Sequence, residues 1–318
     1  MIGITGGAGY IGTRLTEELV KLGHQVKIID QAAPSQEIFS HPQVAYQQGS
    51  ITQAPDLDSF LEGVGFIFHL AAISQVPVCS KEIRRCVEMN LLSTRLILEG
   101  LASAQGGICF SSSVAALYGS PRYLPVDEAH PIQPFNDYGV LKRCSELFCE
   151  AYARSRGLFA VIARQSVVYG PSPAMKYDSV VHAFLRNALQ GKDLQIQGSG
   201  LQFRNFVFLD DLIQGYLKIL KQFETGAKIG GEAFNLAGQE NLTIKDLAEM
   251  VQKVAKEEFA QDIQVQFSQG RTEAAATEFR VSVEKAKNVL GHEPVTSLAE
   301  GLKKTSAYIK QQMGKGVI

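Results

Sequence analysis

Short apolar runs alternate along the chain with longer segments in which apolar residues recur at helical spacing. The runs predict strands at residues 2–5, 26–29, 44–46, 66–70, 108–111 and 159–163. The segment between the first two strands carries one apolar stripe and ends at a glycine: Ile11, Leu15, Leu19, Leu22 and Gly23. Strands that are apolar throughout and are joined by helices are typical of a parallel sheet covered on both faces. The pattern therefore predicts an α/β fold with a Rossmann-type, doubly wound parallel sheet.

The second half of the chain follows a different pattern. Two long helices, predicted at about 81–104 and 137–155, still belong to the alternating half. After the Tyr-Gly-Pro sequence at 169–171, loop-forming residues become frequent, and we expect one strand at 234–236 and helices near 180–189, 243–256, 283–290 and 298–311. The three alanines at 274–276 predict a mobile loop.

These patterns predict two regions of unequal size. We expect a Rossmann domain over 1–168, with a returning segment at about 206–238, and a smaller C-terminal region formed by 169–205 and 239–318. This smaller region is not expected to contain an independent sheet of comparable size.

Composition and charge narrow the class of protein. Of the 318 residues, 45% are apolar and 20% charged, which is ordinary for a globular protein. A net charge of -1 gives no attraction for a polyanion, so a nucleic acid partner is not expected. No leader sequence and no long uncharged apolar stretch occurs, so we expect a cytoplasmic protein without membrane spans. The five cysteines include no C-x-x-C pair and the six histidines are scattered, which favours reduced thiols and no metal site.

The first twelve residues predict a dinucleotide site. Gly6, Gly9 and Gly12 follow the first strand at G-x-x-G-x-x-G spacing and open the first helix. Such glycines permit a tight turn, close approach of a pyrophosphate and close packing of the helix on the sheet. The backbone amides of Tyr10 and Ile11 then face the anion at the helix N-terminus.

The residue that ends the second strand selects between two dinucleotides. Asp30 lies where an acid grips the adenosine ribose hydroxyls. No lysine or arginine follows at 31–36, and a carboxylate would repel a 2′-phosphate. The sequence therefore favours NAD over NADP.

Three polar residues form a candidate catalytic group. Tyr138 and Lys142 are four residues apart, so a helix places both side chains on one face. A lysine ammonium favours the phenolate, and we expect it to lower the tyrosine pKa from about 10 toward the working pH. A bound nicotinamide cation acts in the same direction. The third member is expected at the end of the strand near 108–111, where we favour Ser113 and keep Ser112 as the alternative.

The motifs together resemble the extended short-chain dehydrogenase/reductase family, and within it the NAD-dependent epimerases and dehydratases, the UDP-glucose 4-epimerase type being nearest. The motifs span almost the whole chain: TGGAGYIG at 5–12, Asp30, HLAA at 69–72, Asn90, SSS…LYG at 111–119, Tyr138-x-x-x-Lys142, YGP at 169–171, Gly198-x-Gly200…Arg204 and LGHEPVTSLAEGL at 290–302.

The resemblance implies NAD as cofactor, a nucleotide sugar, a UDP-sugar above all, as substrate, and a homodimer formed through the two long helices. The implied NAD contacts are Gly6, Gly9, Tyr10, Ile11, Gly12, Asp30, Ser50, Ile51, Leu70, Ala71, Ala72, Asn90, Ser111, Tyr138 and Lys142. Lys142 is implied to bond the nicotinamide ribose. The implied substrate contacts are Ser113, Tyr138, Arg204 and Arg271, of which the two arginines match positions that grip the diphosphate.

The chain departs from the family pattern at several positions. Ser50 replaces an acid that contacts adenine, and Val167 replaces an asparagine that often touches the sugar nucleotide. The other departures are Asn205 for Asp, Leu141 for Ser, Ser282 for Asp, and one additional residue between Ser113 and Tyr118.

The resemblance also guides the choice of reaction. In the family, dehydratases carry an acid pair, and decarboxylases a glutamate, directly after the active-site hydroxyl residue. This chain has Val114, Ala115 and Ala116 there. We therefore expect C4 epimerisation of a UDP-hexose through a transient 4-keto sugar. Alternatives are a nucleotide-sugar oxidoreductase, another sugar-nucleotide modifying enzyme such as a dehydratase, and a non-catalytic NAD sensor.

Overall fold

The computed structural model describes residues 1–268 and 278–315, and a parallel sheet of seven strands forms its centre. The strand order is β10-β6-β5-β4-β1-β2-β3, and every neighbouring pair is parallel. The strands are β1 (Ile2–Thr5), β2 (Val26–Asp30), β3 (Val44–Gln48), β4 (Phe66–His69), β5 (Gly107–Ser113), β6 (Phe159–Gln165) and β10 (Ala233–Leu236). The doubly wound α/β fold predicted from the sequence is confirmed.

Helices cover both faces of this sheet, and each face has its own apolar core. Val161 and Ala163 of β6 pack with residues of α1 and α9, whereas Ala160 and Ile162 pack with residues of α2, α5 and α7. This alternation follows from the two-residue period of a strand. The helices are α1 (Tyr10–Lys21), α2 (Ala54–Leu61), α5 (Ser93–Ser103), α7 (Asp137–Arg156) and α9 (Leu209–Glu224). Short helical turns lie at η1 (Glu37–Ser40) and α6 (Val114–Leu117).

The helix predicted at 81–104 is interrupted. The structure has α3 (Val76–Lys81), α4 (Ile83–Cys86), a π-helical turn η2 (Val87–Leu92), and then α5. Asn90 lies in the π turn, where its side chain accepts a hydrogen bond from the Ile73 amide at 2.8 Å and donates to the Ile73 carbonyl at 2.9 Å. A π turn accommodates one additional residue per turn. The hydrophobic pattern does not reveal this turn, because its residues keep the apolar stripe of a regular helix.

The second region has its own core around three helices. These are α8 (Val180–Leu189), α10 (Ile244–Phe259) and α11 (Leu298–Gly314), all as predicted to within a few residues. Two small sheets accompany them: β7 (Val167–Tyr169), β9 (Phe203–Phe208) and β11 (Asn241–Thr243) form one, and β8 (Leu194–Gln197) and β12 (Val265–Ser268) form the other. The helix predicted at 283–290 is largely a π turn, η3 (Ala286–Leu290), ended by Gly291 at positive φ.

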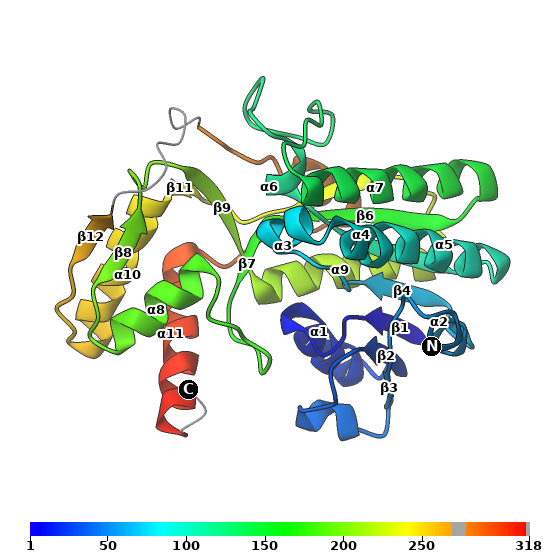
Figure 1. Ribbon diagram of the computed structural model, residues 1–318, viewed down its shortest axis with the longest axis horizontal. Helices are drawn as coiled ribbons and strands as arrows, with labels where there is room; N and C mark the ends of the chain where they lie inside the picture. Colours follow the sequence, from blue (N-terminus) through cyan, green and yellow to red (C-terminus); the bar gives the residue numbers. More distant parts are fainter. Residues whose placement is uncertain (269–277, 316–318) are drawn as a thin grey trace.

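Figure 1 shows the two regions side by side, with β7 and β9 between them. The chain enters the smaller region after β6 and comes back through α9 and β10, which complete one face and one edge of the large sheet. The residue boundaries of the two regions stay a prediction. The loop predicted at 274–276 lies outside the described residues. Among the helices that the structure describes, none combines the length and apolar character that crossing a membrane requires.

Candidate active site

The glycine-rich turn after β1 forms a cradle that side chains would fill. Gly6 has a φ of +72°, and a Cβ there would lie 2.9 Å from the Ala71 backbone. A Cβ on Gly12 would lie 2.5 Å from the Gly6 carbonyl oxygen. Gly9 is the N-cap residue of α1, and no side chain caps this helix. The first amides of α1 are therefore available to an anion such as a pyrophosphate.

Asp30 fixes this cradle from the end of β2. One carboxylate oxygen accepts a hydrogen bond from the Ala8 amide at 3.0 Å, and the other accepts from the Ala32 amide at 3.0 Å. A carboxylate has about four lone-pair sites, so both oxygens can still accept ribose hydroxyls. The structure thus brings Asp30 to the glycine-rich turn, as the predicted ribose contact requires.

The other predicted cofactor residues lie along the same edge. Ser50 Oγ accepts from Gln31 Nε2 at 2.9 Å and lies 2.8 Å from Thr52 Oγ1. Ile51 is buried in the core under α2, so only its backbone can face a ligand. Residues 70–72 follow β4 directly, and the Ala71 amide donates to Thr5 Oγ1 at 3.2 Å.

Tyr10 contributes more than the backbone amide that the sequence suggested. Its hydroxyl donates to the Gly170 carbonyl at 2.8 Å, and its ring packs edge-on against His182 at 5.3 Å. Ser172 Oγ donates to the Tyr10 carbonyl at 2.8 Å. The first turn of α1 is therefore bonded directly to the smaller region.

The predicted catalytic residues meet at the carboxyl end of β5. Tyr138 and Lys142 lie on one face of α7, with Lys142 Nζ 5.8 Å from the centre of the Tyr138 ring. Nζ also donates to the Ser111 carbonyl at 2.6 Å. Asn136 caps α7 by accepting from the Gly139 amide at 2.9 Å, which fixes the start of the helix beside the strand end.

Burial determines the electrostatics of this pair. Burial lowers the pKa of Lys142 to about 8, while Glu146 acts in the opposite direction. Burial also raises the pKa of the Tyr138 hydroxyl well above its usual range, with a contribution from Cys79 in the same direction. The direction is opposite to the predicted lowering, because burial penalises the charged phenolate.

The three serines at the end of β5 have different surroundings. Ser111 Oγ donates to Gln165 Oε1 at 3.2 Å. Ser112 is buried, and its Oγ has no hydrogen-bond partner in the described part of the chain. Ser113 is half-buried at the N-cap of α6, where its Oγ accepts weakly from the Ala116 amide at 3.4 Å.

Arg204, one of the two predicted diphosphate residues, is not brought to this cluster. Arg204 lies exposed on β9, and its guanidinium donates to the Phe203 carbonyl at 2.8 Å. Arg271 lies outside the described residues. The neighbouring Asn205 is buried and bonds the backbone of Gly238 in both directions, so it ties β9 to the loop between β10 and β11.

Sequence reasoning missed two polar residues beside the catalytic group. Gln165 ends β6 opposite Ser113, and its Oε1 accepts hydrogen bonds from the hydroxyls of Ser111 and Tyr216. Tyr216 is a fully buried residue of α9. The predicted strand ended at 163, two residues before Gln165. A polar residue at the carboxyl end of a parallel strand was the signal that could have found it.

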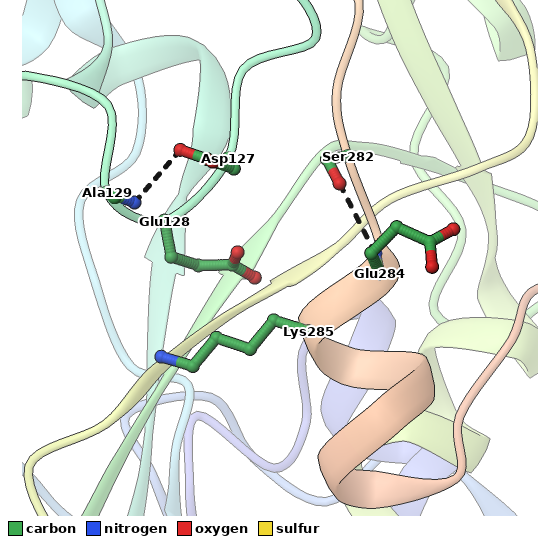
Figure 2. A pocket seen from close by; sticks show the side chains of 6 residues that line it. All are labelled: Asp127, Glu128, Ala129, Ser282, Glu284 and Lys285. Atoms are coloured by element: carbon green, nitrogen blue, oxygen red, sulfur yellow. Dashed lines mark hydrogen bonds between the residues drawn. The ribbon is translucent and has the colours of Figure 1, made fainter.

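A pocket of about 430 Å³ lies apart from these residues, between segments 127–129 and 282–285. Figure 2 shows Glu128 and Lys285 extending into the space between the two segments. No lining residue belongs to the candidate active site: the lining residues are Asp127, Glu128, Ala129, Ser282, Glu284 and Lys285.

Comparison with known proteins identifies the family. The family model described as the NAD dependent epimerase/dehydratase family matches residues 2–237. The chain belongs to the NAD-dependent epimerase/dehydratase family. Members of this family are NAD-dependent enzymes, and the glycine cradle and Asp30 of this member fit a dinucleotide.

Relatives within the epimerase/dehydratase family carry more than one activity in their names. UDP-glucuronic acid decarboxylase 1 of Danio rerio is 29% identical, with 98% of this chain and 72% of that protein covered. The crystal structure of a UDP-glucose 4-epimerase with UDP-glucose from Thermotoga maritima gives a TM-score of 0.87 at 27% identity, covering 98% of this chain and 99% of that chain. The crystal structure of a UDP-glucuronic acid 4-epimerase from Bacillus cereus, in complex with UDP-glucuronic acid and NAD, gives a TM-score of 0.85 at 28% identity. The match covers 98% of this chain and 99% of that chain.

Proposed function

We propose that this family member is a UDP-hexose 4-epimerase that oxidises its substrate transiently at C4. The observation that carries the proposal is the cluster of Tyr138, Lys142 and Ser113 at the carboxyl end of β5, next to the dinucleotide cradle. The solved structures with UDP-glucose and with UDP-glucuronic acid support a UDP-sugar as the substrate class.

The residues of this chain have distinct roles in the proposed reaction. NAD, when bound, would supply the hydride acceptor for oxidation at C4 and the hydride donor for the reverse step. Tyr138 removes the proton of the 4-hydroxyl and gives it back, as general base and then general acid. Ser113 bonds the same oxygen, and its partial exposure favours it over the buried Ser112. Lys142 is proposed to orient the nicotinamide ribose and, together with the positive charge of bound NAD, to offset the burial that raises the pKa of Tyr138.

The smaller region is proposed to hold the nucleotide diphosphate while the 4-keto sugar rotates to present its opposite face. Arg204 and Arg271 are the proposed diphosphate contacts, because a guanidinium matches a phosphate bidentately. Arg204 is exposed on β9, so its guanidinium is accessible to a ligand.

Decarboxylation and net oxidoreduction are the competing reactions. The similarity to the zebrafish decarboxylase supports the first. Against it, the short helix α6 carries Val114, Ala115 and Ala116 and no acid beside Ser113.

Proton NMR tests the proposal. The purified protein is incubated with catalytic NAD and UDP-glucose, UDP-N-acetylglucosamine or UDP-glucuronic acid, and the anomeric signals are followed. We expect the C4 epimer to appear to equilibrium without net NADH. Formation of a UDP-pentose from UDP-glucuronic acid would establish decarboxylation instead. Formation of NADH in a stoichiometric amount would establish a dehydrogenase.

We also propose a homodimer formed through α5 and α7, which lie side by side in Figure 1. Both helices expose apolar side chains although their other faces pack on the sheet. Exposed apolar side chains on neighbouring elements are candidates for an interaction surface. They are Ile83, Leu92, Leu96, Val140 and Leu147 on α4, η2, α5 and α7.

A further inference from the structure

A polar group with no assigned role lies at the end of β6, on the face of the sheet that α9 covers. Gln165 Oε1 accepts hydrogen bonds from Ser111 Oγ at 3.2 Å and from the Tyr216 hydroxyl. Tyr216 is fully buried among apolar residues of the core, and Ser111 is 6% exposed. Buried hydroxyls need hydrogen-bond partners, so the side-chain carbonyl oxygen of Gln165 is occupied by the Tyr216 and Ser111 hydroxyls.

The nitrogen end of the same amide is free to bind something else. Gln165 is half-buried, and within residues 1–268 and 278–315 no group accepts a hydrogen bond from Nε2. An amide nitrogen carries two donors. Because two hydroxyls hold Oε1 in place, these donors point in a fixed direction and would bind an acceptor without loss of rotamer freedom.

The position of Gln165 identifies the acceptor. Asp30 lies on β2, the glycine-rich turn follows β1, and from there the strand order runs through β4 and β5 to β6. Neighbouring strands are about 4.8 Å apart, so a dinucleotide with its adenosine at Asp30 and its pyrophosphate at α1 extends over β4 toward β5 and β6. Its nicotinamide end then reaches the strand ends that carry Ser113 and Gln165, which are partners in register.

A second contact ties Gln165 to the catalytic residues. Lys142 Nζ donates to the carbonyl of Ser111, whose hydroxyl donates to Gln165. The lysine that is expected to bond the nicotinamide ribose and the glutamine are therefore connected through one residue.

We propose that Gln165 Nε2 donates a hydrogen bond to the carboxamide oxygen of bound nicotinamide, and that Ser111 and Tyr216 position it for this contact. The contact fixes which face of the nicotinamide ring is turned toward the sugar. The proposal depends on NAD binding and not on the identity of the sugar or the reaction.

Calorimetric titration of two ligands tests the contact. NAD contains the nicotinamide, whereas ADP-ribose fills the rest of the site without it. For Gln165→Met we expect the affinity for NAD to fall about tenfold, the effect of one lost hydrogen bond, and the affinity for ADP-ribose to stay unchanged. Gln165→Glu should weaken NAD binding further, because it places a carboxylate oxygen opposite the carboxamide oxygen, and both are hydrogen-bond acceptors. The matched control is Gln197→Met, at an exposed glutamine that ends β8.

Tyr216→Phe provides a second, independent variant. It leaves the Gln165 amide in place but removes one of its two anchors, so we expect a loss of NAD affinity of about two- to threefold and no change for ADP-ribose. This variant decides the question if both Gln165 variants fail to fold.

Three results would overturn the proposal. If the variants bind NAD and ADP-ribose more weakly to the same extent, Gln165 only supports the structure of the strand end. Unchanged affinity for NAD would remove the contact altogether. Weaker binding of UDP-glucose with unchanged binding of NAD would assign Gln165 to the sugar. Because binding is measured without turnover, none of these results depends on whether the protein is an epimerase.

Discussion

Tyr138 is the side chain on which the proposed proton transfer depends. For Tyr138→Phe we expect turnover to fall about 10³-fold, the usual contribution of a positioned general base, while NAD binding stays within a factor of a few. Initial rates from the NMR assay and calorimetric titration of NAD measure the two effects. Tyr123→Phe, at an exposed tyrosine, is the matched control and should keep full activity. Equal activity of the two variants would exclude Tyr138 as the base.

The buried Lys142 predicts how the stability of the protein depends on pH. Its pKa is about 8 when folded and about 10.5 when unfolded, so between these values the unfolded chain binds more protons and stability rises with pH. From pH 7 to 9.5 the lysine should add about 2 kcal/mol to the free energy of unfolding. Tyr138 acts in the opposite direction only near and above pH 10, because burial raises its pKa.

Urea unfolding of the wild type and of Lys142→Met at pH 7 and pH 9.5 isolates this contribution, since other titrating groups affect both proteins. A wild-type increase no larger than that of the variant would show that Lys142 titrates normally.

At the scale of elements, α7 is held against β6 by a buried ion pair. Glu146 is completely buried and forms two hydrogen bonds with Arg164, at 3.0 and 2.9 Å. Glu146→Gln leaves the guanidinium without its counter-charge, so we expect a loss of about 3–5 kcal/mol in the free energy of unfolding. Chemical denaturation measures it. Glu82→Gln breaks the exposed pair with Arg85 and should change stability little. Similar effects of the two variants would contradict the proposed role of the buried pair.

The sequence predicted the central sheet and most helices, because each strand contains a short apolar run and the apolar stripes of the helices keep helical spacing. It did not predict the last two residues of β6, because the charged Arg164 ends the apolar run. Only the folded structure shows that Glu146 neutralises this arginine within the core. The strands of the two small sheets were also missed, because short strands such as β8 and β12, of four residues each, pair only through tertiary contacts. Of the candidate site, the glycine turn, Asp30 and the tyrosine–lysine pair follow from spacing, whereas Gln165 and Tyr216 meet only in the folded structure.

At the scale of the whole molecule, the exposed apolar side chains on α5 and α7 predict the assembly. Leu96→Glu together with Leu147→Glu places charges in the proposed interface, and we expect light scattering to report a monomer where the wild type is a dimer. Val295→Glu introduces the same charge at an exposed apolar residue elsewhere and should leave the dimer intact. A wild-type monomer, or a dimer that survives the double substitution, would exclude this interface.

The return of the chain into the large sheet has a consequence for how the protein unfolds. Because α9 and β10 come from beyond residue 200, a fragment that stops at 168 lacks one cover helix and one edge strand, and leaves Phe66, Val161 and other core residues in water. We expect such a fragment to be insoluble or molten, and the intact chain to melt in one calorimetric transition whose van't Hoff and calorimetric enthalpies agree. We therefore expect the two regions, although separate in shape, to fold and unfold as one cooperative unit.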